Sequence, residues 1–200
     1  MTETVPGVDF DDRSALVVVD VQNDFADPRG GLYVQGGDQI VRTINGLVAA
    51  ARAADAIVVY TQDWHPSRTP HFVTDGGPWP VHCVQGSWGA ELHPDLEVAG
   101  PVVRKGTGGE DGYSGFTARD VHTGERVPTD LDGILRQHEI ARVVVVGLAQ
   151  DVCVRDTALD ARLRGYDTTV LLAATRPVNL VPEDDRTANE AMTAAGVTLR

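Results

Sequence analysis

The sequence has few cysteines, no excess of basic residues and no long apolar run. Two cysteines in 200 residues are too few for the disulfide framework of a small secreted protein. The formal net charge of −12 disfavours binding to nucleic acids or anionic lipids, because their phosphates repel such a surface. No stretch reaches the roughly 20 apolar residues that span a bilayer, and residues 1–15 lack the basic and apolar segments of a secretion signal. We therefore expect a cytoplasmic protein with reduced thiols that binds neither nucleic acid nor membranes.

Apolar runs and helical patterns alternate along the chain. Short β-branched runs predict strands at 14–20, 56–63, 101–105, 141–147, 167–173 and 197–199. Helical spacing of apolar residues predicts helices over 38–56, 130–139, 151–165 and 182–196. This alternation predicts an α/β fold, a three-layer α/β/α sandwich around a mostly parallel sheet of roughly six strands. We expect a single domain over residues 1–200, with a metal-binding loop region at about 63–100.

Polar side chains follow four of the predicted strands. Asp20 ends the first strand, Asp63 the second and Lys105 the third. Cys153 follows the fourth, near the start of a predicted helix that has Asp151 close to its N-cap. In parallel α/β folds the carboxyl ends of the strands form one edge, and ligands bind there. We therefore expect these side chains to meet at one candidate site.

Cys153 is the candidate nucleophile, because the amide N–H groups and the dipole at a helix start favour a thiolate. Asp20 ends an apolar strand and is a candidate base with a raised pKa, while Lys105 could pair with it and supply positive charge. Each residue also has an ordinary alternative role. Cys153 could be a small core side chain, Asp20 a helix or turn cap, and Lys105 a solvated surface cation. Cys83 has no comparable setting, so we expect it to be structural.

Three of the six histidines lie in one loop beside an aspartate. The candidate metal ligands are Asp63, His65, His71 and His82. This set suits one divalent transition metal ion, most simply Zn²⁺, with Fe²⁺ or Mn²⁺ as alternatives. A single loop histidine is more often a surface or hydrogen-bonding residue, and we expect that ordinary role for His93, His122 and His138.

Taken together, the motifs resemble a known family. The segments VVVDVQNDF, TQDWHP with a later histidine, PVHCVQGSWGAELHP, VVRKGT and VVVVGLAQDVCVRDTALDA follow one another between Ala15 and Leu172. They resemble the isochorismatase-like cysteine hydrolases and, within that superfamily, the nicotinamidases, which are also called pyrazinamidases. Each motif alone is weak, but the combination of Asp, Lys and Cys with the histidine set is specific.

The resemblance implies a role for each of these residues. The implied catalytic residues are Asp20, Lys105 and Cys153, and the implied metal ligands are Asp63, His65, His71 and His82. A cis peptide is implied before Ala149, with the backbone N–H groups of Ala149 and Cys153 forming an oxyanion hole. The implied pocket residues are Phe25, Trp79, Tyr113, Leu148 and Val152. Nicotinamidases often carry His or Tyr at the position of Val152 and Thr at that of Gln150, so these departures concern substrate preference.

The implied reaction is hydrolysis of a small-molecule amide: nicotinamide to nicotinate and ammonia, or pyrazinamide to pyrazinoate, through a cysteine thioester in NAD salvage. The alternative is a related amidase for another small amide, such as N-carbamoylsarcosine. A scaffold without turnover is disfavoured because the three catalytic residues are present, and a nucleotide-binding module lacks its Gly-x-Gly-x-x-Gly motif. The sequence leaves open whether the ion would hold the ring nitrogen, supply the water or do both. We further expect a homo-oligomer.

Overall fold

Six parallel strands form the sheet that organises the molecule. The computed structural model describes residues 8–120 and 122–200, so the first part of the expected non-secretory N-terminus lies outside the described residues. The strand order is β3-β2-β1-β6-β7-β8, and every neighbouring pair is parallel. The strands are β1 (Ser14–Val19), β2 (Ile57–Asp63), β3 (Val102–Lys105), β6 (Arg142–Leu148), β7 (Asp167–Arg176) and β8 (Thr198–Leu199).

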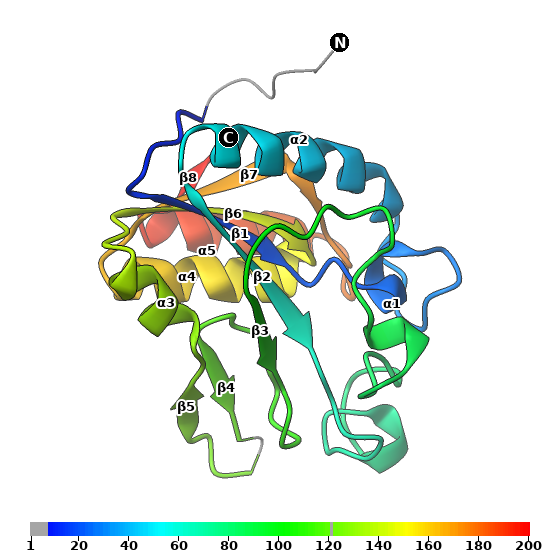
Figure 1. The fold of residues 1–200 in the computed structure, drawn as a ribbon. Helices are drawn as coiled ribbons and strands as arrows, with labels where there is room; N and C mark the ends of the chain where they lie inside the picture. The colour runs from blue at the N-terminus through cyan, green and yellow to red at the C-terminus, as the bar shows by residue number, and fades with distance from the viewer. Residues whose placement is uncertain (1–7, 121) are drawn as a thin grey trace.

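Helices cover both faces of this sheet (Figure 1). They are α2 (Val41–Ala53) on one face, and α3 (Leu131–Gln137), α4 (Arg155–Leu163) and α5 (Asp184–Ala194) on the other. Side chains of a strand alternate between faces, so Leu16 and Val18 belong to the core layer under α2, and Val17 and Val19 to the opposite layer. The predicted three-layer sandwich is confirmed. Within the part of the chain that the structure describes, no helix is long and apolar enough to cross a membrane.

Short elements occur where the sequence patterns predict none. Helix α1 (Asn23–Ala26) follows β1, and an antiparallel pair, β4 (Thr117–Arg119) and β5 (Arg126–Pro128), interrupts the glycine-rich loop after β3. The histidine-rich loop contains two 3-10 turns, Val73–Asp75 and Trp88–Ala90. Pieces of three or four residues are too short to show a helical or alternating pattern, which explains why the sequence does not reveal them.

The connection after β6 differs from the predicted helix over 151–165. A π-helical turn, Gln150–Val154, comes first, and α4 begins only at Arg155. Ala149 is the N-cap of this turn, and Asp151 lies in its first turn, two residues after the N-cap. Cys153 therefore lies in a π turn and not in the first turn of a regular α-helix. Such turns are rare and are found often at functional sites.

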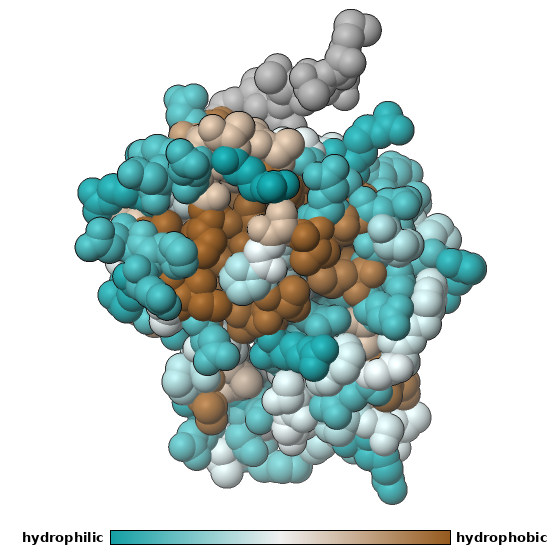
Figure 2. All heavy atoms as spheres, viewed as in Figure 1, coloured by the Kyte–Doolittle hydropathy of each residue, from teal (hydrophilic) through white to brown (hydrophobic). Residues whose placement is uncertain are grey.

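One edge of the sheet is only partly covered. β3 pairs with Tyr60–Asp63 of β2, so within the described residues Ile57–Val59 have no strand partner on that side. Seen from the same direction as Figure 1, Figure 2 shows apolar side chains gathered over the region of β1 and β2, with hydrophilic side chains around them. The loop before β3 covers part of this edge, because Gly100 lies against the Val58 carbonyl and Val58 and Val59 are buried.

Candidate active site

The carboxyl ends of the central strands bring the predicted catalytic side chains together. Asp63 and Lys105 are register partners on β2 and β3, so their side chains project on the same side of the sheet. Asp20 directly follows β1, and the π turn after β6 adds Cys153. Because β1 lies between β2 and β6, these residues meet where the strand order reverses, which is the usual ligand position in such sheets.

Lys105 is the central cation of this group and is almost completely buried. Its ammonium nitrogen lies 2.7 Å from Asp20 Oδ2 and 2.5 Å from Asp63 Oδ1. It also donates to the carbonyl of Gly112 and lies 3.7 Å from Cys153 Sγ. Burial alone would lower the pKa of Lys105, but the two carboxylates raise it well above its usual value. Lys105 is therefore a fixed positive charge beside the thiol.

The two carboxylates differ in their affinity for a proton. Burial raises the pKa of Asp20 to about 6, and the attraction of Lys105 opposes that rise only in part. Burial would also raise the pKa of Asp63, but Lys105 and His65 lower it well below its usual value. Thr61 Oγ1 donates to Asp20 Oδ1 at 2.6 Å and fixes its orientation. Asp63 thus stays ionised, and Asp20 is the carboxylate poised to accept a proton near neutral pH.

The environment of Cys153 differs from the one expected at a helix start. Its side chain is buried, and burial raises the pKa of the thiol well above its usual value. Lys105 acts in the opposite direction, while the Asp20 carboxylate raises the pKa further. Burial therefore favours the protonated thiol of Cys153 and not the thiolate that a regular helix start would favour.

Gln22 fixes the position of Asp63, a role that sequence reasoning missed. Its side-chain carbonyl accepts the Asp63 N–H, and its amide donates to the carbonyls of Asp63 and Ala90, each at 2.8 Å. Gln22 is completely buried and follows Asp20, whose positive φ of 49° turns the chain away from β1. The glutamine side chain thereby ties the end of β2 to the loop that contains Ala90.

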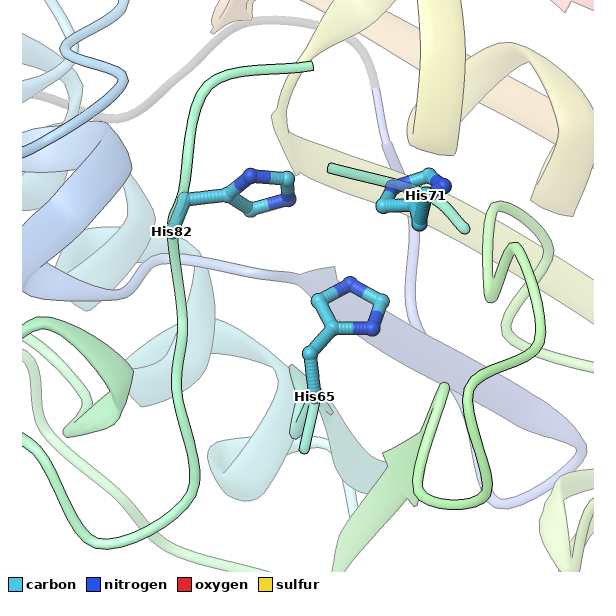
Figure 3. Close-up of side chains that lie close together, drawn as sticks. All are labelled: His65, His71 and His82. Atoms are coloured by element: carbon cyan, nitrogen blue, oxygen red, sulfur yellow. The ribbon is translucent and has the colours of Figure 1, made fainter. Parts of the chain in front are cut away.

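Three histidines point toward one another beside this group (Figure 3). They are His65, His71 and His82, and one ring nitrogen of each lies within 4.8 Å of those of the other two. All three are buried. Asp63 Oδ2 borders the group at 3.6 Å from His65 Nε2 and 4.0 Å from His82 Nε2. Asp63 thus lies between the histidines and Lys105.

The protonation of the histidines suits metal binding. Burial lowers the pKa of His71 to about 3 and also lowers the pKa of His82, so both rings are neutral at physiological pH. His82 Nδ1 lies 2.7 Å from the Pro80 carbonyl, which leaves Nε2 free to act as a ligand. Neither ring nitrogen of His65 has a hydrogen-bond partner among the described residues. Buried imidazole nitrogens without partners fit a divalent transition metal ion.

Gly106 gives the histidine group its space. It directly follows Lys105 and has a φ of +69°, a conformation that side chains rarely adopt. A Cβ atom at this position would lie 2.5 Å from His65 Cε1. The glycine is therefore required both by the turn after β3 and by the close approach of His65.

A cleft of about 350 Å³, open to solvent, leads to Cys153. Its apolar lining consists of Phe25, Leu32, Val34, Trp79, Tyr113, Ala149, Val152 and Val178, and its polar lining of Asp63, His71, His82 and Cys153. Trp79 Nε1 donates to the Tyr113 hydroxyl at 2.8 Å and joins the two loops that carry them. The aromatic walls suit a small flat molecule.

Comparison with known proteins identifies the family. The sequence profile of the Isochorismatase domain matches residues 14–200. This chain belongs to the isochorismatase family. A nicotinamidase of Escherichia coli K12 is 40% identical over 203 residues, covering 92% of this chain and 93% of that protein.

Solved structures of the isochorismatase family have the same fold. The pyrazinamidase of Pyrococcus horikoshii in complex with zinc superimposes with a TM-score of 0.82 at 38% identity, covering 94% of this chain and 98% of that one. An N-carbamoylsarcosine amidase from Thermoplasma acidophilum gives a TM-score of 0.72 at 29% identity, covering 94% and 95%. Both activities proposed from the sequence thus occur among the similar structures.

The positions implied by the isochorismatase resemblance are mostly found in the cleft. The lining includes Phe25, Trp79, Tyr113 and Val152, as expected. Leu148 is the exception, because its side chain is fully buried in the core beneath Gly37 and is absent from the lining. The peptide between Leu148 and Ala149 is cis, and Ala149 lines the cleft.

Three further lining residues were missed by sequence reasoning. Leu32 and Val34 alternate between two glycine pairs, a pattern that could have indicated a loop folded over a site. Val178 follows Pro177 in the connection between β7 and α5, and the sequence carries no signal for its place in the cleft.

The remaining cysteine and histidines have the ordinary roles expected. Cys83 is buried outside the cleft lining, with its sulfur 3.9 Å from the Gly89 carbonyl, which agrees with a structural role. Both cysteines are free. His93, His122 and His138 lie outside the histidine group.

Proposed function

We propose that this protein hydrolyses nicotinamide to nicotinate and ammonia, and pyrazinamide to pyrazinoate, with Cys153 as the nucleophile. The observation that carries the proposal is the placement of the thiol beside Asp20 and Lys105, on an aromatic cleft that also contains the histidine group. The similarity to the Escherichia coli nicotinamidase supports the same substrate.

The first half of the reaction uses three side chains and two backbone groups. Asp20 accepts the thiol proton, and the Cys153 sulfur attacks the carboxamide carbon while Lys105 balances the negative charge. The N–H groups of Ala149 and Cys153 donate to the developing oxyanion, each worth about 3 kcal/mol in the transition state. Protonated Asp20 then gives its proton to the departing ammonia, and an acyl thioester remains on the sulfur.

The second half regenerates the thiol. Asp20, again ionised, accepts a proton from the attacking water, whose oxygen bonds to the thioester carbon. The carbon–sulfur bond breaks, the proton on Asp20 returns to the Cys153 sulfur, and the acid product leaves and loses its own proton to water as nicotinate. Asp20 thus handles the protons of the thiol, the ammonia and the attacking water, which agrees with a pKa raised to about 6.

We assign the metal ligands to His65, His71 and His82, with Asp63 at their border. Zinc is the preferred ion over iron or manganese, because neutral imidazoles suit it and the Pyrococcus horikoshii relative binds it. When bound by these residues, the ion would supply a Lewis acid beside the cleft. Asp63 also holds Lys105, and so connects this group to the catalytic residues.

The composition of the cleft favours a neutral ring amide over N-carbamoylsarcosine. That alternative substrate carries a carboxylate, which a buried site must pair with a cation or a strong donor. Across the described residues, the lining of the cleft includes neither lysine nor arginine, so no cationic side chain of the lining is available to pair with that carboxylate. A pyridine carboxamide is uncharged and can pack against Phe25 and Trp79.

This substrate places the protein in the recycling of nicotinamide for NAD synthesis. We assign it to the cytoplasm, where its two free cysteines would stay reduced. The direct test is ammonia release from nicotinamide by the purified protein, with the Cys153→Ala variant as control. Release should fall about a thousandfold or more in the variant. An unchanged rate in the variant, or no release by the natural protein, would overturn the proposal.

A further inference from the structure

Asp151 is a buried carboxylate that the mechanism does not use. It lies in the π turn two residues before Cys153, and only 2% of it is exposed. Its side chain points away from the catalytic group, toward the connection between β7 and α5. There Oδ1 accepts the N–H of Val178 at 2.9 Å and Oδ2 accepts the N–H of Asn179 at 2.7 Å.

These two hydrogen bonds hold the start of that connection. β7 ends at Arg176, and Pro177 has no N–H, so Val178 and Asn179 provide the first two amide donors after the strand. Asn179 has a positive φ of 47°, which turns the chain sharply at this point. A carboxylate with one oxygen for each N–H is the side chain that matches two consecutive amides.

The segment held in this way forms part of the cleft. Val178 belongs to the lining, together with Val152 and Cys153 of the π turn. Asp151 therefore connects two parts of the cleft: the π turn, which carries Cys153, and the Val178 wall. Gln150 of the same turn bonds to Thr175 of β7 and Asn189 of α5, but Asp151 is the side chain that bonds directly to Val178 and Asn179.

We propose that Asp151 is a positioning residue for substrate recognition, which sets the place of the Val178 wall against the aromatic ring of the substrate. This inference rests on the proposed function for the identity of the ring amide. Because Asp151 does not touch the thiol's partners Asp20 and Lys105, its loss changes binding of the ring more than the chemical step.

The test compares Asp151→Asn with a matched control, Asp184→Asn. Asparagine keeps the shape but replaces one acceptor by a donor that faces an N–H. Asp184 also accepts a backbone N–H in the same connection, that of Val181 at 2.8 Å, but it lies outside the cleft lining. We expect Asp151→Asn to raise KM for nicotinamide on the order of tenfold, with kcat within about threefold. Asp184→Asn should leave both constants near those of the natural protein.

A double variant tests whether Asp151 acts through Val178. Val178→Ala should raise KM in the same direction, and adding Asp151→Asn to it should raise KM little further. Additive effects would contradict the proposal, as would a fall in kcat at unchanged KM. If Asp151→Asn does not fold, the shorter Asp151→Ser withdraws the acceptors without placing an NH2 group against an N–H, and it should raise KM in the same direction.

A second readout does not depend on turnover. Cys153 is alkylated with iodoacetamide and with N-phenyl iodoacetamide. The rate constant for the phenyl reagent divided by that for iodoacetamide measures the preference of the cleft for an aromatic ring. Asp151→Asn should lower this ratio while leaving the iodoacetamide rate within about twofold. An unchanged ratio overturns the inference. Absence of ammonia release by the natural protein, with a lowered ratio in the variant, would instead contradict the proposed substrate alone.

Discussion

Asp20 controls the reactivity of Cys153, because the thiol rests protonated and its proton has to reach that carboxylate. Burial raises the pKa of Asp20 to about 6. Only ionised Asp20 can accept a proton, so the active fraction decreases as the pH falls through this value. We expect kcat/KM for nicotinamide to fall about tenfold per pH unit below about 6. Metal content measured at each pH is the control, and a flat profile down to pH 5 would contradict the role of Asp20.

Single residues also decide whether the histidine group can bind metal. We expect about one transition metal ion per chain by elemental analysis, and a clear loss of it in His65→Ala. Gly106→Ala should have a similar effect, since the added Cβ would lie 2.5 Å from His65 Cε1.

Gly124 is the matched control for Gly106. It has a φ of +74°, close to the +69° of Gly106, but a Cβ there would meet nothing within 4 Å. Gly124→Ala therefore carries the same backbone strain without the clash, and it should keep its metal. Equal metal loss in both variants, or full metal content in His65→Ala, would show that the histidine group is not the metal site.

At the scale of elements, Gln22 joins the end of β1, the end of β2 and the histidine-rich loop. Gln22→Ala leaves the buried N–H and carbonyl of Asp63 without these partners. We expect the free energy of unfolding in urea to fall by about 3 kcal/mol. Gln85→Ala is the control, because Gln85 also bonds two carbonyls but is exposed, and it should cost less than about 0.5 kcal/mol. Similar losses in both variants would contradict the positioning role of Gln22.

The strands and their polar ends were predictable from the sequence, and the reasons are local. An apolar β-branched run that ends in Asp20 or Asp63 indicates a buried strand and its carboxyl end without any knowledge of the fold. The π turn that carries Cys153 was not predictable in the same way. Its π geometry depends on how β6, β7 and α5 pack around it, and a regular helix start is the ordinary expectation from its residues.

The residues that line the cleft could likewise be predicted from the sequence only in part. Phe25 lies in a motif that resembles the family and Trp79 directly precedes another, so their places could be anticipated. Val178 is brought to the cleft by a hydrogen bond to Asp151, 27 residues away in sequence, and Leu148 turns into the core. Sequence spacing cannot show such a contact, because it arises only when the β7–α5 connection folds back onto the π turn.

At the scale of the whole molecule, the partly open edge at β2 bears on the expected homo-oligomer, which stays a prediction. A second copy is the partner we expect for the apolar surface in Figure 2, because an unpaired strand edge beside apolar area favours association. Light scattering after size exclusion should give a multiple of the 21.4 kDa chain mass. Ile57→Lys, on the uncovered part of β2, should shift the protein toward the monomer. A single chain mass for the natural protein would refute the prediction.

The central claim is that the whole chain forms a hydrolase for pyridine carboxamides, and one comparison of kcat/KM values tests it most directly. The substrates are nicotinamide, benzamide and N-carbamoylsarcosine in one buffer. We predict the highest value for nicotinamide. Benzamide should be at least about tenfold poorer because it lacks the ring nitrogen, and N-carbamoylsarcosine poorer still because neither lysine nor arginine lines the cleft to pair with its carboxylate. A higher kcat/KM for N-carbamoylsarcosine than for nicotinamide would contradict the account.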